Sequence, residues 1–208
     1  TKIPRFDFEK FPSADGILGV QMQSVGEVMA IGRTFRESLQ KAYRSLEVGL
    51  NGFEPKETEF RDLDMSKIRF ASAFRLLKVK QAFEQGHSFK DVVIQTQIDP
   101  WFLYQIQKII NVEKEYAQLG NETEFAVSIK NLKRDGFSDC QIARMWDKTE
   151  DEIRQLRKKQ NILPTYKVVD TCAAEFVAKT PYCYSTYETE NEIAPLNGKK
   201  VMILGGGP

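Results

Sequence analysis

The middle of the chain, from about residue 60 to residue 161, places apolar side chains three and four positions apart, with polar residues between them. This spacing puts the apolar side chains on one face of an α-helix. Gly86 and Gly136 end two of these runs, as glycine commonly does at helix C-termini. Short amphipathic helices joined by tight loops bury their apolar faces against one another, so the pattern predicts a helical bundle. The clearest runs are Phe70, Phe74, Leu77 and Phe83, and then Phe102, Leu103, Ile106, Ile109 and Ile110.

Signals for helix starts agree with this pattern. Ser138–Gln141 and Thr149–Glu152 each have the spacing of a capping box, in which a hydroxyl and a Glu or Gln side chain satisfy each other's free backbone N–H groups. Ser88–Asp91 offers a further N-cap, and Asp99–Pro100 fits a helix start because the fixed φ of proline suits the first helical position. Thr34–Glu37 also has capping-box spacing. We therefore expect one more helix nearer the N-terminus, with the apolar stripe Phe35, Leu39, Ala42, Tyr43 and Leu46.

The two flanks differ from the middle in their pattern of apolar and polar residues. Residues 1–52 combine an extended start with one helix and predict an α/β fragment. Residues 164–198 mix β-forming side chains with polar residues and prolines, which predicts an extended connector. An apolar run then predicts one strand over 200–204, within a last segment of 199–208. The expected fold is mainly α, with a helical bundle over 53–163 between these flanks.

Composition and charge narrow the function classes. The 208 residues carry 30 Lys and Arg against 29 Asp and Glu, which leaves a formal net charge of +1. This balance lacks the excess of positive charge that nucleic acids and anionic membranes attract. No apolar run approaches the roughly 20 residues that span a bilayer. We therefore expect no nucleic-acid partner and no membrane partner.

The cysteines and the single histidine point to a reducing compartment. Cys140, Cys172 and Cys183 are odd in number and lack metal-ligand spacing, which argues against a disulfide framework and against a metal site. Cys172 and Cys183 have no cationic neighbour in sequence that would stabilise a thiolate, so we predict small buried hydrophobic residues. A cytoplasmic location is expected, and a mitochondrial one stays open for a eukaryotic source.

Residues 136–162 carry an alternative function. Two short capped helices, of which the second ends in basic residues, imitate a helix-turn-helix whose second helix enters the DNA major groove. Acidic residues crowd the start of that second helix, where they suit the helix dipole but repel DNA. An ordinary helical hairpin with solvated charge is therefore the favoured interpretation, and a DNA-binding module is the weaker alternative. The basic residues concerned are Arg154, Arg157, Lys158 and Lys159.

Two further features suggest chemistry without completing a site. Glu27 lies in an apolar stretch, so its carboxylate is expected either to be paired, with Arg33 as one candidate, or to line a polar cavity. Gly205, Gly206 and Gly207 follow the predicted strand and could open a phosphate-binding turn, although a glycine turn is also plain structural punctuation. The turn looks unfinished, which suggests an excerpt from a longer protein. No catalytic residue and no metal ligand are predicted.

Several longer strings are more specific than any single motif. They are Lys2–Phe6, Gln21–Thr34, Ile98–Leu103, Leu156–Lys159, Val169–Phe176, Tyr184–Glu188 and Leu204–Pro208. In order and spacing they closely resemble the large subunit of carbamoyl-phosphate synthetase over essentially the whole chain. The first two resemble the end of its first ATP-grasp half, the middle ones its helical oligomerisation domain, and the last ones the bridge into its second half.

The resemblance implies a division of the chain into four parts. Residues 1–52 would be the C-terminal end of the first ATP-grasp half, which makes carboxyphosphate, and residues 53–163 the oligomerisation domain. Residues 164–198 would be the connector, and residues 199–208 the first strand and glycine turn of the second half. The ligands for nucleotide and metal would lie upstream of residue 1 and downstream of residue 208, so this segment alone is expected to be catalytically inactive.

The resemblance also implies cofactors and partners for the parent enzyme. It is a ligase that makes carbamoyl phosphate from ATP, bicarbonate and ammonia, with Mg²⁺ and with K⁺ left open, and it serves arginine or pyrimidine biosynthesis. Its partners would be the other domains of the large subunit, a small glutaminase subunit, and further copies bound through the helical domain. Met22 and Glu27 would lie near the tunnel that carries its intermediates. A stand-alone helical interaction module is the alternative function.

Overall fold

The computed structural model describes the chain apart from residues 12, 55–62, 120–121, 180–181, 196 and 206–208. In chain order its elements are β1 (Lys2–Arg5), the 3-10 helix η1 (Phe8–Lys10), β2 (Gly26–Met29), α1 (Phe35–Ser45), the 3-10 helix η2 (Met65–Arg69), α2 (Arg75–Glu84), α3 (Phe89–Thr96), α4 (Pro100–Tyr116), α5 (Glu122–Arg134), α6 (Asp139–Met145), α7 (Glu150–Lys159), β3 (Thr165–Val168) and β4 (Cys183–Thr186). The expected mainly helical fold with short flanking strands is confirmed.

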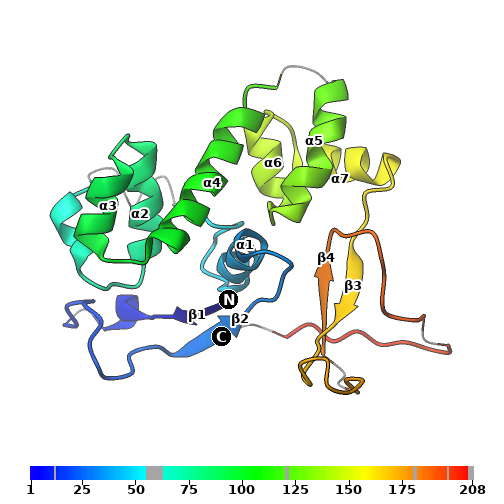
Figure 1. The fold of residues 1–208 in the computed structure, drawn as a ribbon, viewed down its shortest axis with the longest axis horizontal. Coiled ribbons are helices and arrows are strands. Elements are labelled where there is room, and N and C mark those ends of the chain that lie inside the picture. Colours follow the sequence, from blue (N-terminus) through cyan, green and yellow to red (C-terminus); the bar gives the residue numbers. More distant parts are fainter. Residues whose placement is uncertain (12, 55–62, 120–121, 180–181, 196, 206–208) are drawn as a thin grey trace.

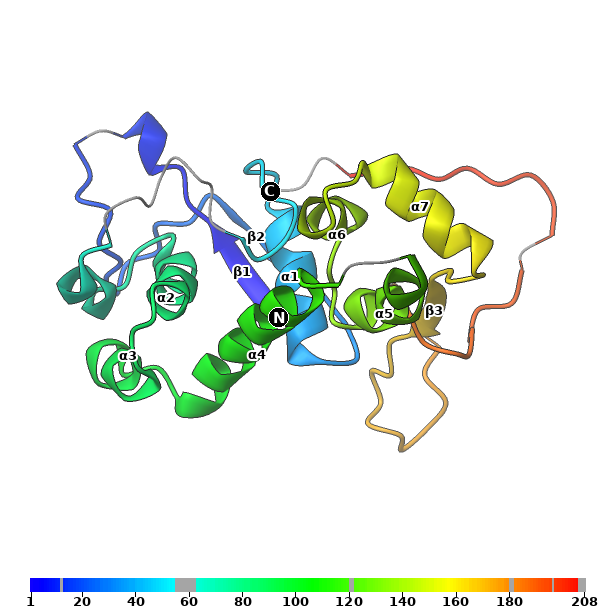
Figure 2. The same cartoon turned by 90° about the horizontal axis from the view of Figure 1, so that it is seen from above.

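Helix α1 lies at the centre of the arrangement. Figure 1 shows it between the β1–β2 pair and the helices α2 to α7, with the β3–β4 pair beside it under α5 and α7. Seen from above, α4 crosses between the α2–α3 end and the α5–α7 end of the bundle (Figure 2). Both strand pairs are antiparallel, with Lys2 opposite Met29 in the first and Thr165 opposite Thr186 in the second. The helical middle is thus flanked by two small sheets, one from each end of the chain.

The predicted helix starts are confirmed, with one change at α1. Ser138–Gln141 and Thr149–Glu152 form complete capping boxes, and the Asp99 carboxylate accepts from the backbone N–H of Trp101 at 2.8 Å. The Thr34 hydroxyl accepts from the backbone N–H of Glu37 as expected. The Glu37 carboxylate, however, accepts from the N–H of Arg33 at 2.6 Å instead of returning to Thr34. It therefore fixes the residue before the cap and orients the chain that enters α1.

One continuous hydrophobic core joins the N-terminal segment to the helical bundle. It starts at Val28 in β2, passes through Leu39 on α1, and continues to Ile153 on α7. Trp146 stacks on Phe125 with ring centroids 4.2 Å apart, and its indole N–H donates to a carbonyl of α4. Because the apolar face of α1 packs into the same core as α4 to α7, the segment from β2 through α1 and the bundle form one packed unit.

The C-terminal flank differs from the prediction. The expected connector over 164–198 contains the β3–β4 pair, and it is therefore more ordered than an extended chain. The strand expected over 200–204 is not formed, and the apolar side chains from Val201 to Leu204 are all exposed. A strand needs a neighbour to take up its backbone hydrogen bonds, and the described residues supply none for this segment. The predicted turn continues into Gly206–Pro208, outside the described residues.

Candidate functional site, a polar joint on helix α1

Helix α1 buries polar side chains as well as its apolar stripe. Glu37 and Gln40 are polar but almost completely buried, because each lies beside apolar positions of the same helix that face the core. A buried polar group costs free energy unless it is hydrogen-bonded, so these side chains demand specific partners. The partners of Glu37 are local, the N–H of Arg33 and the ammonium of Lys41. Those of Gln40, such as Gln141, come from segments far away in the sequence. We call this meeting place the joint. It comprises residues of α1, of the α5–α6 region with α7, and of the C-terminal flank: Arg36, Glu37, Gln40, Lys41, Lys133, Arg134, Asp135, Gly136, Asp139, Gln141, Arg157, Tyr187 and Glu188.

The turn between α5 and α6 lies directly on the backbone of α1. Gly136 has φ of +88°, and a Cβ atom at this position would stand 2.8 Å from Cα and 2.9 Å from the carbonyl oxygen of Glu37. No side chain fits in that space, and L-residues rarely adopt that backbone conformation. The glycine that the sequence offers as a helix stop therefore also permits a close approach of two backbones.

Hydrogen bonds then connect the polar face of α1 to both sides of this turn. The side-chain oxygen of Gln40 accepts from the backbone N–H of Phe53 at 3.1 Å and from the Gln141 amide at 3.0 Å. Arg36 donates twice to one carboxylate oxygen of Asp135, at 2.9 and 2.7 Å, and once to Gln105 on α4. Each of these contacts joins the N-terminal helix to the bundle.

A buried ion cluster lies on the other side of the turn. The Lys133 ammonium donates to Asp139 at 2.7 Å and to the carbonyl of Phe137 at 2.8 Å, and the Arg157 guanidinium donates to the second Asp139 oxygen at 2.8 Å. Lys133 and Asp139 are both buried. Burial lowers the pKa of Lys133 to about 8, although the Asp139 carboxylate opposes that shift. Burial alone would raise the pKa of Asp139, but the two cations outweigh it and lower the pKa.

The β3–β4 pair and the residues after it are attached to the same cluster. The Tyr187 ring lies 5.1 Å from the Lys133 ammonium and 6.0 Å from the Arg157 guanidinium, within the range of cation–π attraction. The Arg134 guanidinium reaches both carboxylate oxygens of Glu188, at 3.0 and 3.2 Å. The joint therefore connects three parts of the chain: the N-terminal segment, the bundle and the C-terminal flank.

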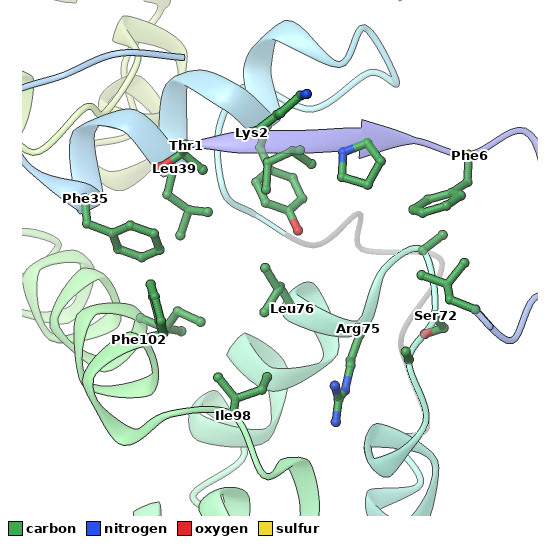
Figure 3. A pocket seen from close by; sticks show the side chains of 17 residues that line it. Thr1, Lys2, Phe6, Phe35, Leu39, Ser72, Arg75, Leu76, Ile98 and Phe102 are labelled. Carbon is green, nitrogen blue, oxygen red and sulfur yellow. The ribbon is translucent and has the colours of Figure 1, made fainter. Parts of the chain in front are cut away.

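An apolar cleft lies on the opposite side of α1. Its volume is about 650 Å³, and it opens between β1 and α1 on one side and α2 and α4 on the other (Figure 3). The Arg75 guanidinium donates to the carbonyls of Ile68, Arg69 and Thr96. Three aromatic side chains lie at the α4 end of the cleft. The ring centroid of Phe35 is 5.4 Å from that of Trp101 and 5.3 Å from that of Phe102. A cleft of this kind suits an apolar surface better than acid–base chemistry.

The structure separates the residues that the sequence singled out. Glu27 is paired, but with Lys2 across the β1–β2 pair at 2.6 Å and not with Arg33, and both side chains are about half exposed. Met22 is 85% exposed. Their place along a tunnel stays a prediction. Cys183 is exposed, so the expectation that it is buried is wrong: strand β4 has one open face there.

Two of the basic residues that the helix-turn-helix alternative requires, Arg154 and Arg157, are already in ion pairs. Helices α6 and α7 do form a hairpin over the predicted residues. Arg157, however, is committed to Asp139, and Arg154 forms ion pairs with Glu150 and Asp151 in the first turn of its own helix. A guanidinium that is already paired contributes little to phosphate binding. Through Asp139 and Arg157, the hairpin is part of the joint.

Neither the ligand cluster of a metal site nor a membrane-spanning helix is found among the described residues. Within the described ranges, no group of three or more His, Cys, Asp or Glu side chains is arranged to hold a metal ion. The helices that the structure describes include none that is both long and apolar enough to cross a membrane.

The sequence did not predict most contacts of the joint, although polar residues within two apolar helical stripes were a weak signal for it. Lys133 falls four positions after the buried Ile129 and so lies on the apolar face of α5. Gln40 follows Leu39 and precedes Ala42 in the stripe of α1. A polar residue inside an apolar helical stripe indicates a buried hydrogen-bonded group. Its partner cannot be read from periodicity.

Comparison with known proteins gives a consistent result. The sequence profile described as "Carbamoyl-phosphate synthetase large chain, oligomerisation domain" matches residues 27–161. The chain is 50% identical over 212 residues to the carbamoyl phosphate synthase large chain of Pseudomonas aeruginosa, 51% over 216 residues to that of Buchnera aphidicola, and 46% over 215 residues to that of Archaeoglobus fulgidus. Each match covers 100% of this chain and 20% of the relative, so the chain spans about a fifth of the length of these relatives.

The close approach at Gly136 predicts a difference between two glycines. Gly86 has nearly the same φ, +87°, but a Cβ atom there would have nothing within 4 Å. Gly86→Ala should therefore cost only the backbone strain, about 1–2 kcal/mol. Gly136→Ala should cost about 1–3 kcal/mol more, because the turn has to move away from α1. Urea unfolding of the two variants measures the difference. Equal losses would contradict the close approach.

Burial of Lys133 predicts an unusual titration. The folded-state pKa of about 8 lies below the ordinary 10.5, so between these pH values the unfolded chain binds more protons. The contribution of this group to stability therefore rises with pH across that window. NMR of ¹³C-labelled lysine should show one resonance with a midpoint near 8. Asp139→Asn should lower that midpoint further, since it removes the carboxylate that favours the charged amine. A midpoint that rises in the variant would refute the assignment.

Proposed function

The chain belongs to the family of carbamoyl-phosphate synthetase large chains, and we propose that within such a large chain it acts as a brace between two synthetase halves and as a surface for self-association. The observation that carries the proposal is the joint. Hydrogen bonds and ion pairs connect the helical bundle to the N-terminal segment through the partly buried Arg36 and the buried Gln40, and to the C-terminal flank through the half-exposed Arg134. The segment contributes geometry and no catalytic group.

The reaction proposed for the whole large chain takes place in the parts beyond this segment. One ATP phosphorylates bicarbonate to carboxyphosphate and leaves ADP. Ammonia then attacks the carboxyl carbon, phosphate departs, and carbamate results. A second ATP phosphorylates carbamate to carbamoyl phosphate and leaves the second ADP. Positioning of phosphates by Mg²⁺ and cationic groups supplies most of the rate in such transfers. The nitrogen is proposed to come from a glutaminase partner subunit.

A brace matters for this chemistry because two of the proposed intermediates are unstable in water. Carboxyphosphate has to meet ammonia in the first half, and carbamate has to pass to the second half without release, so the halves must keep a fixed geometry. Small displacements of reacting groups can cost large factors in rate. The joint is suited to this task, since its buried hydrogen bonds and ion pairs, together with the more exposed contact of Arg134 to Glu188, hold in only one arrangement of α1, the α5–α6 turn and the C-terminal flank.

Exposed hydrophobic side chains on the helices support the proposed self-association. Trp101 and Phe102 at the start of α4 are 52% and 44% exposed, and Ile94 on α3 is 58% exposed. Contiguous exposed apolar groups on a folded domain commonly mark an interaction surface. The matched profile is itself described as an oligomerisation domain.

Sedimentation tests the self-association. The weight-average mass of the chain should rise with protein concentration, because burial of exposed apolar surface favours the associated state. A second run with the full-length large chain, in which other surfaces are covered, should show the same rise. A strict monomer at high concentration in both runs would rule out this part of the proposal.

A charge exchange tests the brace. Arg134→Glu in the full-length large chain places two carboxylates opposite each other at the contact with Glu188 and should push the C-terminal flank away from α5. With ammonium as the nitrogen source, ADP formed per carbamoyl phosphate should rise about twofold or more, because the halves lose register. Arg134→Glu combined with Glu188→Arg restores an opposite pair and should restore the ratio.

The exchange has a clear negative result. If Arg134→Glu leaves the ratio of ADP to carbamoyl phosphate at the wild-type value, the C-terminal contact does not keep the halves in register. If the ratio rises but the double variant does not bring it back, the effect comes from elsewhere. Bicarbonate-dependent ATP hydrolysis without ammonium serves as the control, since it needs only the first half and should be unchanged in both variants.

A further inference from the structure

The Lys41 side chain occupies a special place in the joint. Its ammonium donates to the carbonyl oxygen of Ile31 at 2.6 Å and to the carbonyl oxygen of Ser185, also at 2.6 Å. Ile31 follows strand β2 near the N-terminus, and Ser185 lies in strand β4, so one nitrogen atom holds two backbone segments that are far apart in the sequence. The other described contacts of the joint connect the bundle to one flank at a time. Lys41 connects the two flanks to each other.

The surroundings of Lys41 show a constrained position. Its side chain is only 18% exposed, and the Glu37 carboxylate lies 3.8 Å from its ammonium. The Tyr184 ring lies 5.7 Å from the same ammonium. Burial lowers the pKa of Lys41, an effect that Glu37 opposes. The Glu37 carboxylate and two short charge-assisted hydrogen bonds to carbonyls offset part of the free energy of desolvating the amine.

A second contact joins the same two segments. Arg33 follows Ile31 by two residues, and a side-chain hydrogen bond to Tyr184 is the main reason why the pKa of its guanidinium is raised. Residues 31 to 33 therefore meet residues 184 and 185 twice, once through the buried ammonium and once at the surface. The surface contact is screened by solvent and is worth little by itself. The register between the segments depends on Lys41.

We infer that Lys41 is a positioning residue that sets the register between the two flanks and thereby couples the two ATP-dependent steps of the parent enzyme. The inference rests on the proposed function as a brace. It goes further because it assigns the coupling to one side chain and to two backbone carbonyls. A carbonyl cannot be removed by substitution, but its donor can, and this makes Lys41 the residue through which the register can be tested.

Variants of Lys41 in the full-length large chain provide that test. Lys41→Met keeps the length and apolar stem of the side chain and removes all three donors. Lys41→Arg keeps a cation with several donors that can reach two carbonyls. With ammonium as the nitrogen source, Lys41→Met should raise ADP formed per carbamoyl phosphate about twofold or more. Lys41→Arg should stay close to the wild-type ratio. Lys158→Met, at an exposed position on α7, is the control and should change nothing.

Two measurements separate coupling from a loss of folding. Bicarbonate-dependent ATP hydrolysis without ammonium should remain within about twofold of the wild type in every variant, because it needs only one half. Carbonyl ¹³C shifts of Ile31 and Ser185 should move in Lys41→Met and not in Lys158→Met. If Lys41→Met does not fold, Lys41→Gln replaces it: its shorter amide can serve one carbonyl at most, and it should show an intermediate ratio.

The outcomes distinguish this inference from the proposed function. If Arg134→Glu uncouples the enzyme and Lys41→Met does not, the brace stands and the role of Lys41 is refuted. Equal uncoupling by Lys41→Met and Lys41→Arg also refutes it, because the donors are then irrelevant. If neither Arg134→Glu nor Lys41→Met changes the ratio, the brace itself is refuted. The inference is supported if Lys41→Met raises ADP formed per carbamoyl phosphate and Lys41→Arg does not.

Discussion

The structure depends on one steric constraint, the contact between the backbone of α1 and the turn at Gly136. Only a residue without a Cβ atom lets the two backbones come this close. Because they do, Gln40 can reach Gln141 on one side of the turn, and the Lys133–Asp139 pair forms at its other side. The N-terminal segment and the bundle share a single core. The C-terminal flank packs on the cationic side chains of Lys133, Arg134 and Arg157.

The buried ion cluster is better understood as a device for specificity than as a source of stability. Removing Lys133 from water costs free energy that the attraction of Asp139 only partly returns, as the lowered pKa of Lys133 reflects. A pair of this kind is satisfied in one arrangement and heavily penalised in others. That property has little value for a domain that merely has to fold. It has clear value for a segment that fixes the relative positions of its two flanks.

Local features of this fold could be predicted from sequence, and its long-range contacts could not. Capping residues such as Ser138 and Thr149 act within one turn of helix, so their spacing alone identifies the starts of α6 and α7. The joint depends on partners as distant as Gln40 and Gln141, and no local pattern specifies such a pairing. The strand predicted over 200–204 is not formed for the same reason, since a β-forming run becomes a strand only beside a partner and the described residues offer none. The resemblance to a known family identified the role of the chain but not the residues that perform it.

Native-state hydrogen exchange of the β3–β4 pair is the most direct test of the central claim that the joint holds both flanks on the bundle. A two-stranded sheet is marginally stable by itself, so strong protection of its amides has to come from docking. The account predicts that amides of Lys167 and Val169 exchange only in the same opening that exposes α1, with similar free energies. Fast exchange of these amides while α1 stays protected would contradict it, because the C-terminal flank would then move independently of the joint.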